Sequence, residues 1–350
     1  MGGVLSFAEV TLAVTILAGL PLTGAEPDRI VIGLLVTTGP SAEALTEGAE
    51  QAVNEINMAG GIDGRDLELA RLAVGGPWSD GAGLTARLVF EERVVGLIGP
   101  TADGAAHVAA QIATRKRIPV ITLSPEESLT QAMVPWVFRG VPGDGAQARA
   151  LLRGLFEDPQ GKTALLAVPD GRSGRERATA VRSACRDLGV RVVETLVGDQ
   201  PAGDDSTAAD VLLLWLDAAQ AVGRLQALGR EGTPQRILGS TRLDTPELVG
   251  ALPDWAKGLV LPLLRGDSAS PVVAPGIHHA LGYDGIRALA DAARRRGREP
   301  EALRRGLGET QVHGHTGTFA FDSRGNRVGS IEFGVVRNGQ LLRPRLRGGH

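Results

Sequence analysis

The chain has 350 residues, of which 43% are hydrophobic and 22% charged, and its formal net charge is −3. This length suffices for two domains with separate cores, and the composition is that of a globular chain, not of a disordered or fibrous one. Long runs of Lys or Arg are lacking, and phosphate binding needs clustered positive charge, so we expect no nucleic-acid partner. The single cysteine, Cys185, cannot form an internal disulfide, and its place on an apolar helical face indicates a buried core residue.

Residues 1–25 are expected to form a signal peptide that is removed on export. Residues 10–22 are apolar or small, a run too short to span a bilayer but suited to a signal-peptide core. A basic n-region is missing before Arg29, so this leader is atypical. We expect a periplasmic mature chain that begins near Glu26, is not embedded in a membrane and is a monomer.

Strands and helices alternate from residue 29 to residue 123. The continuous apolar run Ile30–Val36 indicates a strand of a parallel sheet that is covered on both faces. Further elements are expected, in order, at 42–56 (helix), 67–74 (strand), 84–90 (helix), 94–98 (strand), 105–112 (helix) and 118–123 (strand). Ser41 is expected to cap the first helix, and Asp103 a later one. This order predicts a doubly wound parallel sheet with helices on both faces.

The alternation starts again after Arg139. Helices are expected at 148–155, 181–188, 218–228 and 277–293. Strands are expected at 163–168, 190–196, 211–216, 236–238, 258–263, 318–321 and 331–336. The connection between Leu196 and Val211 is short and rich in Gly, Pro and Asp, so a full crossover helix does not fit there. Two α/β units in series fit either independent domains or one hinged pair.

Several motifs carry a family resemblance. Residues 57–69 read NMAGGIDGRDLEL, and this segment resembles a turn of the type I periplasmic binding proteins of the Leu/Ile/Val-binding class, the substrate-binding receptors of branched-chain amino-acid ABC transporters. Other segments that resemble this family follow in its order at 95–100, 118–124, 136–139, 282–287 and 314–325. The resemblance covers nearly the whole mature chain. It implies two doubly wound parallel-sheet α/β domains, joined by a three-crossing hinge, with the ligand between them.

The resemblance also sets the domain boundaries that we expect. The three crossings are placed near Arg139, Leu263 and Phe321. The resulting domains are 28–139 with 264–321 (domain one) and 140–263 with 322–350 (domain two). Ligand binding would then shift an equilibrium between open and closed hinge states.

The candidate ligand site follows from a rule for open α/β sheets, whose ligands lie beyond the carboxyl ends of the strands. The candidate residues in those loops are Thr38, Ser41, Ala102, Asp103, Ser124, Glu126, Asp170, Ser173, Trp215 and Arg242. In the amino-acid-binding proteins that the chain resembles, a hydroxyl residue after the third strand meets the ligand carboxylate at a helix N-terminus, which favours an anion. Here Ala102 and Asp103 stand there, and Asp103 would repel a carboxylate. Ser173 takes the place of a ligand-contacting Tyr.

Asp103 and Arg242 leave two interpretations open. If both face the cleft, a zwitterion or polar amide lies across it with its cationic end toward Asp103 and its anionic end toward Arg242, which can pair in bidentate fashion. This is the reverse of the usual orientation in the family that the chain resembles. Otherwise Asp103 is a helix cap and Arg242 a solvated surface charge.

No catalytic, metal or cofactor site is expected. His278-His279 and His313-Gly-His315 lack a carboxylate or Cys at helical spacing, and residues 140–145 are rich in glycine but lack the Lys and Ser/Thr of a phosphate loop. The expected function is therefore not enzymatic. It is a receptor that binds an amino acid or similar small polar solute and passes it to ABC permease subunits. The alternative, which the departures among the site residues favour, is a periplasmic regulatory or sensor module with a protein partner.

Overall fold

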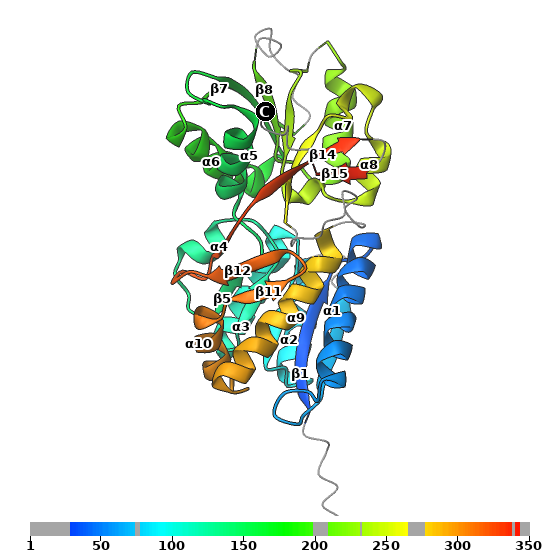
Figure 1. Ribbon diagram of the computed structural model, residues 1–350, viewed down its shortest axis with the longest axis vertical. Coiled ribbons are helices and arrows are strands. Elements are labelled where there is room, and N and C mark those ends of the chain that lie inside the picture. Colours follow the sequence, from blue (N-terminus) through cyan, green and yellow to red (C-terminus); the bar gives the residue numbers. More distant parts are fainter. Residues whose placement is uncertain are drawn as a thin grey trace, which may run out of the picture.

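The computed structural model describes residues 29–73, 78–198, 209–231, 233–264, 277–337 and 340–343. Two α/β domains lie one above the other along the long axis of the molecule (Figure 1). The expected signal peptide and the Gly-, Pro- and Asp-rich residues 199–208 lie outside the described residues. None of the helices in the described part of the chain has both the length and the apolar character that a membrane span requires.

The lower domain is built on a five-stranded parallel sheet in the order β2-β1-β3-β4-β5. Its strands are β1 (Ile30–Val36), β2 (Leu67–Ala73), β3 (Gly96–Ile98), β4 (Val120–Thr122) and β5 (Val137–Arg139). The central strand fixes the register, since Ile32 lies opposite Leu69 on one side and Gly96 on the other. The predicted doubly wound parallel sheet is confirmed.

Helices cover both faces of this sheet, as its apolar strands require. On one face, α1 (Pro40–Met58) and α9 (Ile277–Arg296) lie side by side, with α10 (Pro300–Glu309) beyond them (Figure 1). The other face carries α2 (Trp78–Phe90) and α3 (Asp103–Lys116), with the short α4 (Ser128–Gln131) beside β5. Leu34 of β1 is buried toward α1 and α9, and Leu35 toward α2 and α3.

Helices α1 and α9 touch backbone to backbone through two glycines. A Cβ at Gly48 would lie 1.9 Å from the His279 carbonyl oxygen, and one at Gly282 would lie 2.0 Å from that of Leu45. Any side chain at either position would force the helices apart. The GYDG motif at 282–285 therefore has a packing role.

The diagnostic segment 57–69 is likewise a structural turn. The Asn57 side chain donates to the Leu67 carbonyl oxygen and accepts from the Leu67 N–H, so it ties the end of α1 to the start of β2. Gly61 has a φ of 72°, and a Cβ there would lie 2.0 Å from the Arg65 carbonyl oxygen. Only glycine fits this left-handed, crowded position.

A three-stranded antiparallel sheet, β11 (Val312–Gly314), β12 (Gly317–Phe321) and β13 (Arg327–Gly329), completes the lower domain. Asp284 of α9 anchors its first turn by accepting hydrogen bonds from the N–H groups of His315 and Thr316 and from the Thr316 hydroxyl. The buried Arg327 guanidinium, over the Phe319 ring, donates to Thr316 and to the Gly140 carbonyl oxygen. This network ties the sheet to the hinge.

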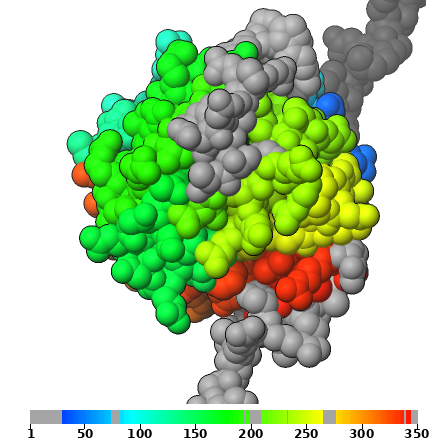
Figure 2. All heavy atoms as spheres, turned by 90° about the horizontal axis from the view of Figure 1, so that it is seen from above, coloured from blue at the N-terminus to red at the C-terminus, as the bar shows by residue number. Residues whose placement is uncertain are grey.

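The upper domain contains a seven-stranded sheet in the order β15-β14-β10-β9-β8-β6-β7. Its strands are β6 (Thr163–Val168), β7 (Arg191–Val197), β8 (Val211–Leu214), β9 (Ile237–Gly239), β10 (Val260–Leu263), β14 (Glu332–Arg337) and β15 (Gln340–Leu342). All pairs are parallel except those of β14 with β10 and β15. Seen from above, the red C-terminal strands lie along one edge of the green and yellow upper domain (Figure 2).

Helices also cover both faces of the upper sheet. One face carries α5 (Asp144–Leu155) and α6 (Gly171–Asp187), and the other α7 (Ala218–Leu228) and α8 (Pro246–Ala251). Two short 3₁₀ helices, η2 (Thr241–Leu243) and η3 (Asp254–Ala256), follow β9 and α8. Cys185, a residue of α6, is fully buried, as predicted, and burial raises the pKa of its thiol to about 11.

The chain passes between the domains at three places. These lie between β5 and α5, between β10 and α9, and between β13 and β14. The expected third crossing near Phe321 is wrong, because Phe321 pairs with Arg327 in the lower domain before β14 joins β10 in the upper one. Residues 322–329 therefore belong to the lower domain. The β12–β13 hairpin was not expected because its second strand has only three residues.

Candidate functional site

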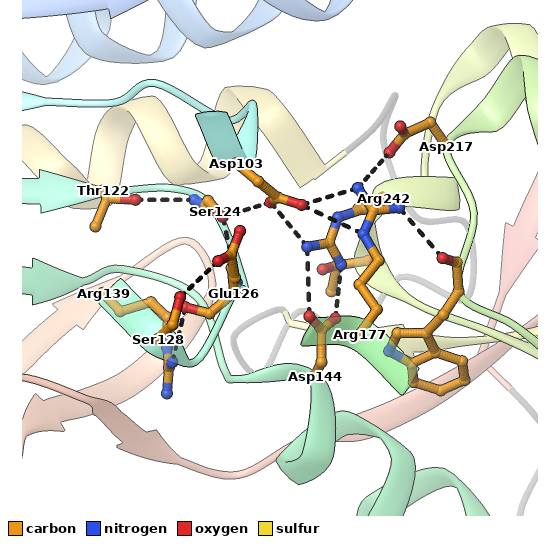
Figure 3. A network of polar contacts seen from close by, with 12 residues as sticks. Asp103, Thr122, Ser124, Glu126, Ser128, Arg139, Asp144, Arg177, Asp217 and Arg242 are labelled. Carbon is orange, nitrogen blue, oxygen red and sulfur yellow. Dashed lines mark hydrogen bonds and ion pairs between the residues drawn. The ribbon is translucent and has the colours of Figure 1, made fainter. Parts of the chain in front are cut away.

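The carboxyl ends of the two parallel sheets face each other. Strands β5 and β10 both lead into chain crossings, and parallel strands share one direction, so the loops after β3 and β4 meet the loops after β6, β8 and β9. Figure 3 shows the polar side chains that these loops bring together. This is the place where ligands of open α/β sheets bind.

Asp103, the first residue of α3, lies at the centre of this network (Figure 3). Its Oδ1 accepts a hydrogen bond from Ser124 Oγ at 2.6 Å and from Arg242 Nη2 at 2.9 Å. Its Oδ2 accepts from Arg177 Nη2 at 2.9 Å. Ser124 belongs to the lower domain and both arginines to the upper one, so Asp103 connects the two domains.

Asp103 is ionised although its side chain is only 3% exposed. Burial alone would raise its pKa, but Arg242, Arg177 and the hydrogen bond from Ser124 hold the pKa of this carboxyl well below its usual range. The N-terminal end of α3 also favours a negative charge. The protein's own carboxylate thus lies in the first turn of α3, although it does not cap the helix N–H groups.

Both guanidiniums have further acidic partners. Arg242 Nη1 lies 2.6 Å from Oδ1 of Asp144, a fully buried residue at the start of α5. Arg177 Nη2 lies 3.1 Å from Asp217 Oδ1, and its Nη1 donates to the Trp215 carbonyl oxygen. Burial lowers the pKa of Arg242, but Asp144 and Asp103 raise it by more, so the net shift is upward. Arg177 and Arg242 are thus saturated by protein groups.

A second cluster surrounds Glu126, which is completely buried. Its Oε1 lies 2.9 Å from His107 Nε2 and accepts from Ser128 Oγ at 2.5 Å and from Arg172 Nη2 at 2.9 Å. Its Oε2 has no hydrogen-bond partner among the described residues. Burial would raise the pKa of Glu126, but hydrogen bonds from His107 and Ser128 leave it below the ordinary value. Arg172 reaches this cluster from α6 of the upper domain.

The structure brings five of the ten candidate residues into these clusters: Asp103, Ser124, Glu126, Trp215 and Arg242. Trp215 takes part through its carbonyl oxygen, whereas its ring belongs to the core beneath α5 and α6. In the described part of the chain, no hydrogen bond joins the other five candidates to either cluster. These five are Thr38, Ser41, Ala102, Asp170 and Ser173.

Both predicted helix caps are wrong. Helix α1 has Gly39 as its N-cap residue, because Pro40 takes the first helical position, where its missing N–H has no consequence; Ser41 is already inside the helix. Helix α3 has Ala102 at its N-cap, and the arginines hold the Asp103 carboxylate away from the helix N–H groups.

The idea of a solute between Asp103 and Arg242 is also corrected. The two side chains do face each other, but they pair directly at 2.9 Å, which leaves no space for a zwitterion between these two groups. Arg242 is not a solvated surface charge either, because its side chain is only 8% exposed.

Sequence reasoning missed the partners of these residues, chiefly Arg177, Arg172, Asp144 and His107. One signal was available for Arg177. It lies on the same helical face as the buried Gly174, Val181 and Ala184, and a charged residue on an apolar face requires a buried partner.

The histidine pairs form no metal site. The rings of His279 and His315 stack at 6.0 Å, and His315 stacks on Tyr283 at 3.7 Å. Within the described ranges, no three His, Cys, Asp or Glu side chains lie together in a way that could hold a metal ion.

Two hinged α/β domains whose polar loops meet between them define a two-domain binding protein. The model of the periplasmic binding protein family matches residues 29–264, so the chain belongs to that family. A curated relative, the Leu/Ile/Val-binding protein BraC3 of Rhizobium johnstonii, is 26% identical over 188 residues. That match covers 52% of this chain and 51% of the relative, so the chain spans about half the length of the curated relative that it matches.

Solved structures show the same fold. The substrate-binding protein LivJ of Streptococcus pneumoniae, in complex with isoleucine, has a TM-score of 0.72 and 23% identity, over 89% of this chain and 97% of LivJ. A solute-binding protein of R. palustris, in complex with benzoate, has a TM-score of 0.73 and 19% identity, over 90% of this chain and 95% of that one. At these identities the likeness concerns the fold, and the relatives' ligands differ from one another.

Proposed function

We propose that the protein is an extracytoplasmic receptor that closes its two domains on a small polar solute and delivers it, as a monomer, to the permease subunits of an ABC importer. The observation that carries the proposal is the meeting of Asp103 and Glu126 from the lower domain with Arg177, Arg242 and Arg172 from the upper one. These contacts lie at the carboxyl ends of the strands of both sheets. Membership of the periplasmic binding protein family supports the same function.

The arrangement explains how closure works in the proposed receptor. The ion pairs of Asp103 with Arg177 and Arg242 join residues of different domains, so they break when the hinge opens. A solute that enters the open cleft and contacts both domains adds its own contacts to the closed form. Its differential affinity for the two forms sets how far the equilibrium shifts.

A thermal-shift screen followed by small-angle scattering tests this function. Amino acids, amides, amines and small carboxylates are screened, because a solute that binds only the folded protein raises its melting temperature; at 100 times Kd the stabilisation is about 2.7 kcal/mol. The solute found should then reduce the radius of gyration. A screen without any shift, or an unchanged radius at saturation, would contradict the proposal.

Export is the part of the proposal that concerns residues 1–25. Mass spectrometry of the protein from a native-like host should give an N-terminus near Glu26, because the apolar run at 10–22 suits signal-peptidase processing. An intact Met1 on cytoplasmic protein would argue against export.

The regulatory alternative has one specific observation in its favour. Asp103, Arg177 and Arg242 already satisfy one another across the domain boundary, so the closed form is stabilised by the protein's own groups. A regulatory module would use this closed surface to bind a protein partner. Uptake assays separate the two functions: deletion of a transport receptor abolishes uptake of its solute, whereas deletion of a regulatory module does not.

A further inference from the structure

One nitrogen atom in the Glu126 cluster lies among three polar atoms of the lower domain. Arg172 Nη2 is 2.9 Å from Glu126 Oε1, 3.2 Å from His107 Nε2 and 3.3 Å from Ser128 Oγ. A guanidinium Nη carries two hydrogens, whereas a primary ammonium carries three donors on one nitrogen. Because His107 Nε2 donates to Glu126 Oε1, the acceptors around this point are Glu126 Oε1 and Ser128 Oγ, and a buried carboxylate beside a hydroxyl suits a small cation such as an ammonium.

Two further observations favour a ligand at Glu126. Glu126 Oε2 is buried and has no partner among the described residues, and a buried carboxylate oxygen is costly to leave unpaired. Arg172 is the one upper-domain partner of Glu126 in the described chain, and its side chain is 48% exposed. It is therefore the member of the cluster that can be displaced at little cost.

The arginines beside this cluster already pair with protein carboxylates. The Asp103 carboxylate lies at the N-terminus of α3 and holds both Arg177 and Arg242. To reach either arginine, a carboxylate on the solute would have to displace this buried side chain, and Glu126 would repel it. The site thus offers carboxylate and hydroxyl acceptors for a cation, whereas both of these arginines are already paired with protein carboxylates.

We infer that the solute is a primary amine without a free carboxylate beside its amino group, and that its ammonium replaces Arg172 against Glu126 and Ser128. Alkylamines and amino-acid amides belong to this class. The inference rests on the proposed function, since it requires a solute between the domains.

Matched probes test the class of solute. Isopentylamine, leucinamide and leucine form one set, and phenethylamine, phenylalaninamide and phenylalanine another; the members of each set differ at the carboxyl position. Titration calorimetry should show binding of the amine or the amide in at least one set, and at least ten-fold weaker binding of the matching amino acid.

Variants test the position. Glu126→Gln should weaken binding of the best amine by about ten- to a hundred-fold, as expected for loss of a charge-assisted hydrogen bond. Ser128→Ala should weaken it several-fold. Arg172→Ala should tighten it several-fold, because the competing cation is removed; a role for Arg172 in holding the solute predicts the opposite. Arg175→Ala, an exposed position on the same helix, is the matched control and should leave binding unchanged.

The outcomes separate this inference from the proposed function. Equal or tighter binding of the amino acids overturns the inference but supports a solute receptor. If the wider screen finds other solutes but none of the six probes binds, the inference is also overturned, and a solute receptor is still supported. No binding of any solute overturns both. If Glu126→Gln does not fold, Arg172→Ala and Ser128→Ala still decide the position.

Discussion

Asp284 illustrates how a single buried carboxylate can hold a loop without any part in binding. Burial raises its pKa, while hydrogen bonds from Thr316 and the charge of Arg327 act in the opposite direction. The hydrogen bonds connect α9 to the β11–β12 turn within one domain. Loss of this carboxylate therefore affects the lower domain whether the hinge is open or closed.

Replacing Asp284 should consequently destabilise the lower domain. Asp284→Ala leaves two backbone N–H groups and the Thr316 hydroxyl without their acceptor and removes the negative charge that acts on the buried Arg327, so we expect a loss of about 3–5 kcal/mol in the free energy of unfolding. Urea denaturation measures it. The control is Asp291→Ala on the same helix, whose surface ion pairs with Arg287 and Arg294 should contribute less than about 1 kcal/mol. Equal losses in the two variants would contradict this role.

His278 provides a pH dependence at the same scale. Burial lowers its pKa to about 4, and the charge of Glu247 only partly opposes this. The pKa in the folded state thus lies below the unfolded value of about 6.5. Protonation favours the unfolded chain, so the stability due to neutral His278 is complete above about pH 6.5 and is lost as the pH falls toward 4.

Urea denaturation at pH 7.5 and 5.0 tests this dependence. The loss of stability on acidification should be larger in the parent than in His278→Gln, by up to about 2 kcal/mol, since each pH unit in this window is worth about 1.4 kcal/mol. Other groups titrate in both proteins and cancel in the difference. Equal losses would mean that His278 accepts a proton as easily when folded.

At the scale of elements, the contact between α1 and α9 depends on glycine. Gly282→Ala places a Cβ 2.0 Å from the Leu45 carbonyl oxygen, so the two helices must move apart. We expect a loss of about 1–3 kcal/mol or more in the free energy of unfolding. The control is Gly223→Ala in α7, where a Cβ meets no atom within 4 Å and should stabilise the helix by up to about 1 kcal/mol. A stabilising Gly282→Ala would contradict the close contact.

The elements that sequence reasoning predicted are those with a continuous apolar pattern. The strand β6 has the bounds that its apolar run at 163–168 predicts, and α9 follows its apolar face over five turns. Strands β11 and β13 have three residues each and only one apolar residue apiece, too few for a pattern, although both pair with the neighbouring β12. The third crossing was misplaced for that reason.

The site was less predictable than the fold because its charges pair across the domain boundary. The strand-end rule found Asp103, Ser124, Glu126 and Arg242, since each follows a strand of its own sheet. It could not show that an aspartate and an arginine 139 residues apart contact each other. The rule concerns loops that follow strands, so it does not apply to Arg177, which lies inside a helix.

At the scale of the whole molecule, we expect the interdomain ion pairs to set the balance between the open and closed forms of the proposed receptor. In the closed form Arg177 and Arg242 share Asp103, and each guanidinium also has an acidic partner in its own domain. Of the ion pairs that these two arginines make, opening would break only those with Asp103, because Asp217 and Asp144 move with the arginines. The charge at Asp103 should therefore affect hinge closure more than the stability of either domain.

Asp103→Asn should shift the hinge toward the open form. Each charge-assisted hydrogen bond contributes about 1.5–3 kcal/mol, so weakening the two pairs should raise the opening constant by at least ten-fold. Small-angle scattering should show a larger radius of gyration than that of the parent protein under the same conditions. Asp217→Asn, which removes a pair within the upper domain, is the control and should leave the radius unchanged. If Asp103→Asn has the parent's radius, the contacts of the hinge segments hold the domains together, and the ion pairs at Asp103 follow closure without causing it.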